Sequence, residues 1–373
     1  MILDKIKIDR KTLKDMDFTL LLVPVIISLY SAMNVYSAAH NQSDISNTWK
    51  LQLMWLVLGL ICVYLIIKMD YNFFINYAEV IYWASIVLLI VNDIFGSTRN
   101  GAKGWIAIGQ RAIQPSEVAK IGLVLMLAKK LDGMKDGINN VKNFFTLLIY
   151  AAIPMGLILI ESDMGMTMVC FFIVLGVFFI AGLDLKVIFG GLFGVVGGVA
   201  AIWNTPLMKP YWKARFFSFL NPEKYSSTSG LQLLQSQIAI GSGGVLGKGF
   251  LKGTQIQGGY IPENYTDFIF AVVGEEWGLI GAIVLIIFYG IFLYRVIRTC
   301  RNARDTFGKI FCAGIAASFL FSIYINMGMA IGIAPISGLT LPFMSYGGSS
   351  MLTAFIAVGI VLKIGITKDG ISF

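Results

Sequence analysis

The sequence contains a single histidine, His40, and four cysteines in 373 residues. A zinc site is usually built from several His or Cys ligands, and a serine–histidine catalytic pair needs a histidine beside its nucleophile. The scarcity of both residue types argues against a zinc enzyme and against a serine hydrolase. Cys62, Cys170 and Cys312 fall in apolar runs and Cys300 in an expected cytoplasmic loop, so we expect no disulfide.

Charged residues are also scarce. Asp, Glu, Lys and Arg make up 13% of the chain, about half of their usual share in soluble domains. Hydrophobic residues make up 57%, and the mean hydropathy is +0.77. They fall in runs close to the roughly 20 residues with which an α-helix crosses a bilayer. The composition therefore predicts an all-α polytopic membrane protein, with residues 1–373 forming one integral membrane domain.

The apolar runs predict about ten transmembrane helices. The fourth is short and is expected to be the least hydrophobic. The first run is too long for a cleavable signal peptide and lacks a small-residue cleavage site, so we expect it to remain as a helix. The expected spans are about 17–37, 50–68, 75–95, 115–131, 143–161, 163–182, 185–203, 267–297, 307–331 and 343–364.

The distribution of Lys and Arg predicts the orientation. Short loops on the side of both termini are much richer in these residues, which places both termini in the cytoplasm. The long loop between the seventh and eighth spans, about 204–266, then lies outside. Its segment "LQLLQSQIAI" has helical spacing and predicts an interfacial helix. Basic residues are not interleaved with aromatic ones, so no nucleic acid partner is expected.

The glycine-rich segment "GSGGVLGKGF" of this loop fails the phosphate-loop pattern, because Ser242 and Gly249 stand where that pattern needs Gly and Ser or Thr. Two interpretations remain open. Backbone amides exposed by glycine, with Lys248 beside them, would bind an anion such as a lipid pyrophosphate. Alternatively, the segment forms a tight turn at a helix end.

Acidic residues occur inside or next to several spans. Glu117 follows Pro115 at the start of the fourth span, which is ordinary helix-start chemistry, but Lys120 lies on the same face and predicts an interior ion pair. Glu161 and Asp163 occupy a short turn that we expect to be solvated.

Asp267 begins the eighth span and is open to two interpretations, an N-cap or a functional carboxylate. Glu275 and Glu276 lie too deep in the same helix to be caps. Buried carboxylates mark polar cavities or ion paths in membrane proteins. We therefore expect this helix to line an interior cavity open to the outside.

Four segments together carry a resemblance to a known family. In order along the chain they read "WIAIGQRAIQPSEVAK", "GSGGVLGKGFLKGTQ", "IPENYTDFIFAVVGEEWG" and "LTLPFMSYGGSS". With this order and spacing, the chain resembles the SEDS family of bacterial cell-wall polymerases over nearly its whole length, and in particular the branch that serves cell elongation and shape. In "NGAKGW" the basic residue, Lys103, stands two positions before the tryptophan instead of directly before it.

The resemblance implies a peptidoglycan glycosyltransferase of the bacterial cytoplasmic membrane. Its substrate would be lipid II, a disaccharide-pentapeptide on undecaprenyl pyrophosphate, polymerised into β-1,4 glycan strands outside the membrane. The implied partners are a class B penicillin-binding protein and other membrane proteins of the elongation complex. The family's essential aspartate corresponds to Asp267. Composition alone also allows a flippase or another transporter of lipid-linked precursors.

The residue chemistry fits glycosyl transfer. One general base must take the proton of the attacking hydroxyl, and Asp267 is the candidate. The pyrophosphate leaving group is stable as an anion and needs cations rather than a second acid. A divalent ion, Mg²⁺ or Mn²⁺, would share that task. We expect Glu117 and Lys120 to shape the cavity, and Glu275 and Glu276 to be structural or to polarise it. The expected external cations are Lys103, Arg111, Lys213, Arg215 and Lys248.

Overall fold

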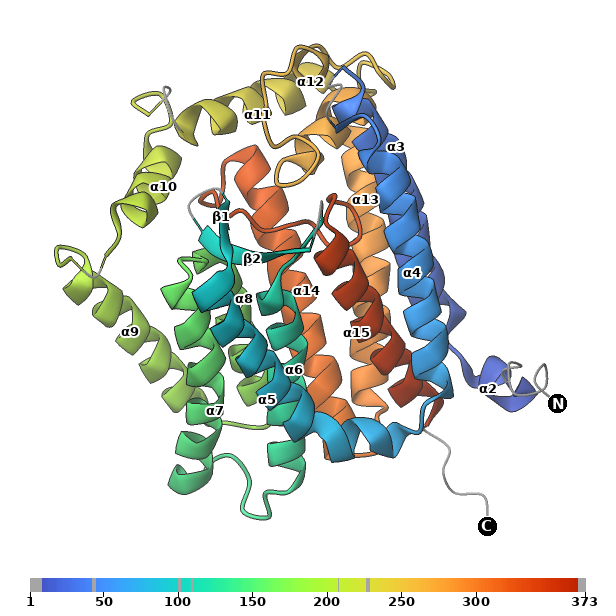
Figure 1. Ribbon diagram of the computed structural model, residues 1–373, viewed down its shortest axis with the longest axis vertical. Helices are drawn as coiled ribbons and strands as arrows, with labels where there is room; N and C mark the ends of the chain where they lie inside the picture. Colours follow the sequence, from blue (N-terminus) through green and yellow to red (C-terminus); the bar gives the residue numbers. More distant parts are fainter. Residues whose placement is uncertain are drawn as a thin grey trace.

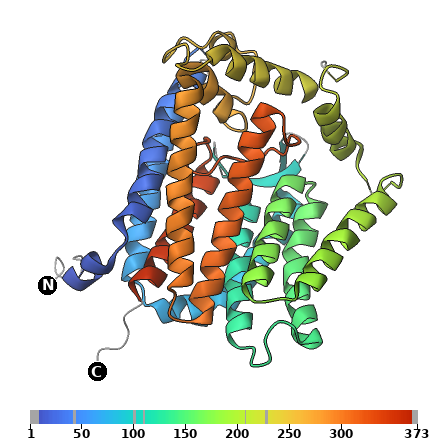
Figure 2. The same ribbon diagram turned by 180° about the vertical axis from the view of Figure 1, so that it is seen from behind.

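The structure is a computed structural model that describes residues 9–41, 45–99, 102–108, 111–206, 208–225 and 229–367. Long helices run side by side as a bundle (Figures 1 and 2). The short helix α2 (Arg10–Asp15) precedes it. The long helices are α3 (Phe18–Ala39), α4 (Thr48–Lys68), α5 (Tyr71–Phe95), α6 (Pro115–Asp132), α7 (Val141–Ile160), α8 (Met164–Ile180), α9 (Leu185–Ile202), α13 (Ile269–Arg301), α14 (Thr306–Ile331) and α15 (Gly348–Ile366).

The predicted helical bundle is confirmed, but two of the ten expected spans differ from the others in length or in charge. By length and composition, eight of the described helices could cross a membrane: α3, α4, α5, α7, α9, α13, α14 and α15. The other two expected spans are α8, which has 17 residues, and α6, whose apolar stretch is bounded and interrupted by charges. Because α6 is buried along most of its length, protein rather than lipid surrounds it.

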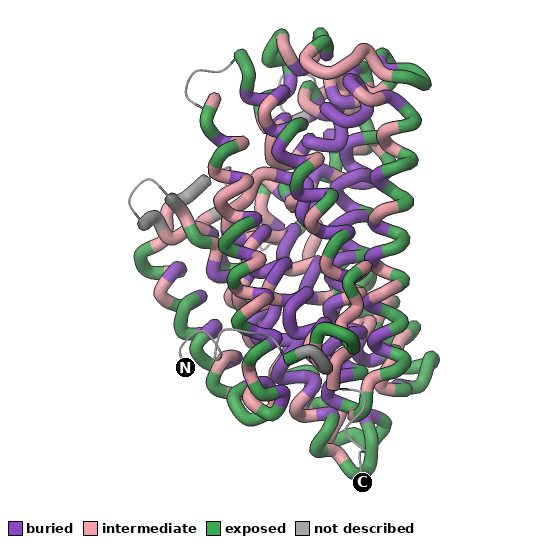
Figure 3. The backbone as a smooth tube through the Cα atoms, turned by 90° about the vertical axis from the view of Figure 1, so that its right-hand side faces the viewer, coloured by how far each residue is buried: buried purple, intermediate pink, exposed green. Residues whose placement is uncertain are grey.

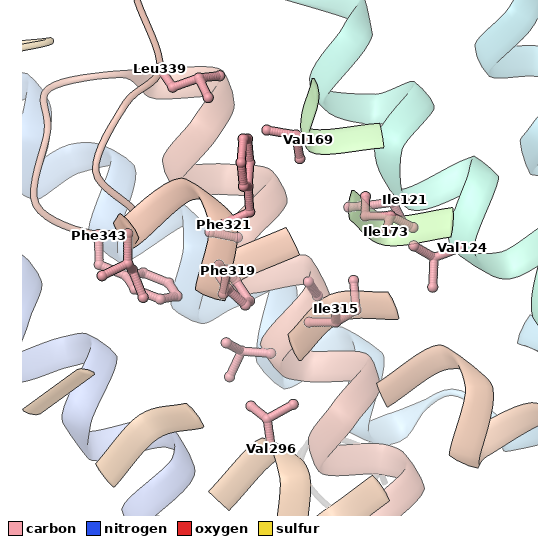
Figure 4. Close-up of a cluster of buried hydrophobic side chains, with 14 of the residues drawn as sticks. Ile121, Val124, Val169, Ile173, Val296, Ile315, Phe319, Phe321, Leu339 and Phe343 are labelled. Atoms are coloured by element: carbon pink, nitrogen blue, oxygen red, sulfur yellow. The ribbon is translucent and has the colours of Figure 1, made fainter. Parts of the chain in front are cut away.

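The core lies around α6, α8 and α14. Ile121 of α6, Ile173 of α8 and Ile315 of α14 are buried among the side chains drawn in Figure 4. Helices α14 and α6 approach each other closely because Gly314 has no side chain: a Cβ there would come within 2.8 Å of Val124. Buried residues concentrate inside the bundle, and exposed ones follow the outer faces of its helices (Figure 3).

One end of the bundle carries the long loop, which is folded into helices α10 (Pro210–Leu220), α11 (Ser229–Gly243) and α12 (Thr254–Gln257). The helix predicted from "LQLLQSQIAI" is confirmed within α11. Helix α10 was not predicted, although Pro210 stands at a first helical position, where its fixed φ and missing N–H are tolerated. Helix α2 and the end of α15 lie at the opposite end of the bundle (Figure 1).

The helical fold includes one small element that was not predicted, between α5 and α6. Three short antiparallel strands form a sheet there: β1 (Ser97–Arg99), β2 (Ala102–Ile108) and β3 (Arg111–Ile113). Ile106 pairs with Ile113, and Ile108 pairs with Arg111. The isoleucines and Trp105 favour extended backbone, and the segment is too short for a helix to compete.

Helix α13 bends at Gly278, whose φ of 65° and ψ of −161° are accessible to glycine alone. The glycine-rich segment wraps this bend. The amides of Lys248 and Gly249 donate to the carbonyl oxygens of Glu275 and Glu276, both at 3.0 Å. These amides are therefore used within the protein. The tight-turn interpretation is confirmed, and an anion site made of these two amides is excluded.

Helix α9 diverges from the bundle (Figures 1 and 2), and none of its residues is buried. At its start, Asn139 of the α6–α7 loop holds the turn before it: Asn139 Nδ2 donates to the Gly182 carbonyl at 2.9 Å, and the Asp184 amide donates to Asn139 Oδ1 at 3.0 Å. Beyond α9 the chain continues into α10. Helix α9 is thus fixed at its start rather than along its length.

Candidate active site

A cavity of about 450 Å³ opens at the end of the bundle that carries α10. It lies between α4, α6, α10, the sheet and the segments around 263–267 and 337–350. Among the described side chains, its charged lining comprises one cation, Arg215, and four acids: Glu117, Asp163, Glu263 and Asp267. Three separate stretches of sequence thus bring carboxylates to one space.

Asp267 lies just before α13 but does not cap it. The N-cap position is occupied by Phe268, and the helix begins at Ile269. The backbone around Asp267 is fixed from the neighbouring elements, since Asn326 Nδ2 donates to the Asp267 carbonyl at 2.9 Å and Ser345 Oγ donates to the Thr266 carbonyl at 2.6 Å. The N-cap interpretation is therefore wrong, and the side chain lies in the cavity wall.

Arg215 is the cation that lies near the Asp267 carboxylate in the cavity wall. Its Nη1 donates to the Ser337 carbonyl at 2.9 Å, and its guanidinium lies 4.4 Å from the centre of the Tyr211 ring. A Cβ built on Gly338 would lie 3.5 Å from the guanidinium nitrogens and 3.6 Å from Asp267 Oδ2. The two charged groups therefore face the same small space, and a side chain at Gly338 would intrude between them.

The surroundings of Asp267 tune its acidity. Burial and the nearby Glu263 raise its pKa and Arg215 lowers it, with a net pKa of about 7. A carboxyl with a pKa near the working pH is ionised in a large fraction of molecules and still accepts a proton readily. Asp267 thus has the acid–base property that a general base needs.

Asp163 is a cavity residue that the sequence analysis assigned to a solvated turn, and that prediction is wrong. Its Oδ1 caps α8 by accepting from the Met166 amide at 2.9 Å, and its Oδ2 accepts from Gln114 Nε2 at 3.0 Å. Burial raises the pKa of Asp163, while the Met166 amide and Arg215 lower it. The available sequence signal was the position of an acid immediately before an apolar helix.

Glu161, in the same turn, is 1% exposed and accepts from Asn92 Nδ2 at 2.7 Å. Burial raises its pKa to about 7. Glu161 does not line the cavity, but it supports the turn that carries Asp163: the amide of Lys103 in β2 donates to the Glu161 carbonyl at 2.9 Å. The two acids of this turn therefore have different roles, one in packing and one in the cavity wall.

The predicted ion pair of the fourth span is confirmed. Lys120 Nζ lies 2.7 Å from Glu117 Oε2, and Thr353 Oγ1 donates to the same oxygen at 2.9 Å. Glu117 is 3% exposed and lies on the cavity lining, whereas Lys120 lines a small recess that Glu117 also borders. The pair joins α6 to α15 at the base of the site.

Glu275 and Glu276 do not line the cavity, so of the two roles expected for them the cavity-polarising one is wrong and the structural one remains. Glu275 is 0% exposed; its Oε1 accepts from Lys248 Nζ at 2.6 Å and from the Gln255 amide at 2.9 Å. Glu276 accepts from the hydroxyl of Ser37. The bend at Gly278 directs this part of α13 toward the loop, so both acids bind the loop and α3 to α13.

The remaining predicted cations also lie away from the cavity lining. Lys248 is bound to Glu275, and Lys103 Nζ donates to the Asp93 carbonyl at 2.6 Å, at the C-terminal end of α5. Lys213 of α10 is not part of the lining. Arg111 belongs to β3, and its side chain lies outside the described part of the structure.

The divalent ion has no ready-made protein site in the described ranges. Within them, no three His, Cys, Asp or Glu side chains are grouped closely enough to hold a metal ion. Asp163 and Asp267 both face the space near Arg215, and the remaining ligands of an ion there would have to come from the substrate or from water.

Comparison with known proteins agrees with the resemblance seen in the motifs. The profile of the FtsW/RodA/SpoVE family, described as cell cycle protein, matches residues 13–369. Peptidoglycan glycosyltransferase RodA of Treponema pallidum is 31% identical, over 94% of this chain and 97% of its own length. Peptidoglycan glycosyltransferase MrdB of Escherichia coli strain K12 is 32% identical, over 95% of this chain and 96% of its own.

A solved structure, from work on the coordination of polymerization and crosslinking by a peptidoglycan synthase complex, has the same fold. Its matching chain superposes with a TM-score of 0.83 at 30% identity, over 95% of this chain and 99% of that one. The family profile, the relatives and the fold all cover nearly the full length. The chain is a multi-pass membrane protein that belongs to the FtsW/RodA/SpoVE family.

Proposed function

We propose that this protein is a peptidoglycan glycosyltransferase that polymerises lipid II into β-1,4 glycan strands for cell elongation and shape. The observation that carries the proposal is the position of Asp267, a carboxyl with a pKa of about 7 beside Arg215 in the cavity wall. The names of the RodA and MrdB relatives support the same activity.

In the proposed reaction, Asp267 accepts the proton of the acceptor sugar hydroxyl. The hydroxyl oxygen forms a bond to the anomeric carbon of the donor sugar, and the bond from that carbon to the pyrophosphate oxygen breaks. The pyrophosphate leaves with the electron pair. Arg215 balances the negative charge that develops on it, as a fixed cation does at a developing oxyanion.

Glu117 and Lys120 act on the shape of the site. The pair fixes α6 against Thr353 of α15, which holds the base of the cavity in place while the sugar units move. Their opposite charges compensate each other, so the base of the cavity presents a polar but balanced surface.

The proposal includes an orientation and a partner. Both termini lie in the cytoplasm, the α10–α12 end faces outward, and a class B penicillin-binding protein cross-links the strands that emerge there. The likeness to a chain of a peptidoglycan synthase complex supports such a partner. In a cysteine-free background, a cysteine at Glu223 should react with an impermeant thiol reagent from outside, and one at Asn302 only after permeabilisation. Reversed labelling would contradict the outward-facing site.

The central experiment is lipid II polymerisation by purified protein with its partner, comparing wild type with Asp267→Asn. A general base contributes about 10²–10⁴-fold to rate, so the variant should lose at least two orders of magnitude. Glu223→Gln, a similar change at an exposed loop position, serves as the matched control and should retain activity. Near-normal polymerisation by Asp267→Asn at equal folded amounts would remove Asp267 from the mechanism.

A further inference from the structure

The cavity has an aromatic side as well as a charged one. Trp55 of α4, Tyr265 and Tyr346 line it together with the acids and Arg215. Each of these three residues is partly exposed, so part of its side chain is accessible in the cavity. Neither the proton transfer nor the charge compensation described above uses any of these rings.

The three aromatic residues form a connected wall. A Cβ on Gly348 would lie 2.3 Å from Trp55 Cε2, so the indole packs directly on the glycine backbone. Two residues before Gly348, the Tyr346 amide donates to the Tyr265 carbonyl at 2.9 Å, and the two rings lie 5.9 Å apart, centre to centre, at 48°. Two residues after Tyr265 comes Asp267. The wall therefore ends beside the proposed base.

Hydrogen bonds to the backbone connect the segments that carry this wall. Ser345 Oγ donates to the Thr266 carbonyl at 2.6 Å, and Gln52 Nε2 of α4 donates to the Ser345 carbonyl at 3.1 Å. One serine thus ties the Tyr346 segment to the Tyr265 segment and to the helix that carries Trp55. A surface whose backbone is fixed in advance loses less conformational entropy when a ligand binds.

The chemistry of such a surface matches a pyranose ring. A sugar presents apolar C–H faces that pack on aromatic rings and hydroxyl edges that hydrogen-bond polar groups. The same cavity supplies polar groups around the wall, including Thr340, Ser349 and Ser350. A polyprenyl chain would instead require a predominantly apolar lining. The mixed lining therefore favours a saccharide over a lipid tail as the occupant.

We infer that Trp55, Tyr346 and Tyr265 form the saccharide subsite that holds the acceptor sugar, with one ring face on the aromatic wall and the attacking hydroxyl on Asp267. This inference rests on the proposed glycosyl transfer and extends it by separating two subsites. The acceptor sugar lies on the aromatic wall, and the donor pyrophosphate lies on the side of Arg215.

The first test measures the kinetics of lipid II polymerisation by Trp55→Leu. Loss of one aromatic contact should raise KM about 3- to 10-fold with a smaller change in kcat, because the ring binds substrate and transition state alike. Trp55→Phe keeps a ring and should recover much of the loss. Trp83→Leu removes a tryptophan that is 47% exposed on α5, outside the cavity lining, and should leave KM unchanged.

Gly348→Ala provides a perturbation that keeps every aromatic side chain. Its methyl group would overlap the indole of Trp55, so the ring must move, and KM should rise as it does in Trp55→Leu. Unchanged KM in both variants would overturn the subsite. So would an equal rise in Trp83→Leu, since the effect would then reflect general loss of packing.

The second test is independent of turnover. The uncharged disaccharide of N-acetylglucosamine is added to wild-type protein in nanodiscs, and saturation-transfer NMR is recorded after irradiation of the protein's aromatic protons. Ring C–H protons of the sugar should receive saturation in wild type and at least threefold less in Trp55→Leu. No transfer to the sugar in wild type would refute the subsite even if the protein polymerises lipid II. Transfer by a protein that does not polymerise would refute the proposed function and keep the saccharide site.

Discussion

Removing the positive charge of Arg215 should change the pH dependence of polymerisation in a predictable direction. In the proposed reaction Asp267 accepts a proton only when it is ionised, so kcat/KM should rise with pH through its pKa of about 7. Arg215 favours the ionised form. Arg215→Gln should therefore move the midpoint of the profile to higher pH.

The size of the shift follows from the geometry. The guanidinium and the carboxylate lie within 3.5 and 3.6 Å of one point beside Gly338, so they are no farther apart than about twice that distance. Two unit charges at roughly 7 Å interact by about 2 kcal/mol at an effective dielectric constant of about 20. One pKa unit corresponds to about 1.4 kcal/mol, and the separation used is an upper limit, so the midpoint should rise by at least roughly 1.5 pH units.

The assay is the initial rate of lipid II polymerisation between about pH 5.5 and pH 9.5. The absolute rate of Arg215→Gln should also fall, because the pyrophosphate loses its cation, but only the midpoint reports on Asp267. Arg215→Lys keeps the charge and should keep the midpoint. Lys213→Gln removes a cation two residues away that does not line the cavity, and should change little. An unshifted midpoint in Arg215→Gln, or an equal shift in Lys213→Gln, would refute the assigned electrostatic coupling.

Two further predictions concern packing. Glu117→Ala leaves Lys120 as a mostly enclosed, unpaired charge, so folded yield should drop with a destabilisation of about 3–5 kcal/mol. Combining Glu117→Gln with Lys120→Met should restore the folded yield, measured by size-exclusion chromatography, better than it restores activity. A silent single change would contradict the interior position of the pair. Gly278→Ala forces a methyl group to within 2.3 Å of the Gly247 nitrogen and strains the backbone by about 1–3 kcal/mol or more, which should lower the unfolding temperature. Gly290→Ala, at a position on the same helix where a Cβ meets no other atom, is the control and should leave the unfolding temperature unchanged.

The features that could be predicted from sequence are those encoded over long or repetitive stretches. Hydropathy over 20-residue windows identifies the spans, and an i, i+3 spacing is enough to pair Glu117 with Lys120 because both lie on one helix face. The helix in "LQLLQSQIAI" was recognisable for the same reason. These three features depend only on the spacing or the hydropathy of residues close together in the sequence.

What could not be predicted depends on contacts between distant segments. Glu275 and Glu276 were expected to face a cavity because the sequence predicts an unbroken helix. The bend at Gly278, which has no signature in the apolar pattern, changes the course of that helix. Asp163 was expected in a solvated turn because nothing local in the sequence shows that it lies in the wall of a cavity with Arg215. Trp55 and Tyr346 are separated by most of the chain, so their common wall has no sequence signature.

The exposed helix α9 has a consequence for how the protein responds to the surrounding bilayer. None of its residues is buried by this chain, so its packing partners lie outside the chain, and a transmembrane helix that packs on lipid adjusts its tilt to the thickness of the bilayer. The same stretch of chain continues into α10, which carries Arg215 to Asp267. Detergent micelles impose no fixed thickness. Bilayers of graded acyl-chain length are therefore the appropriate medium for comparing rates, since α9 directly precedes the helix that carries Arg215.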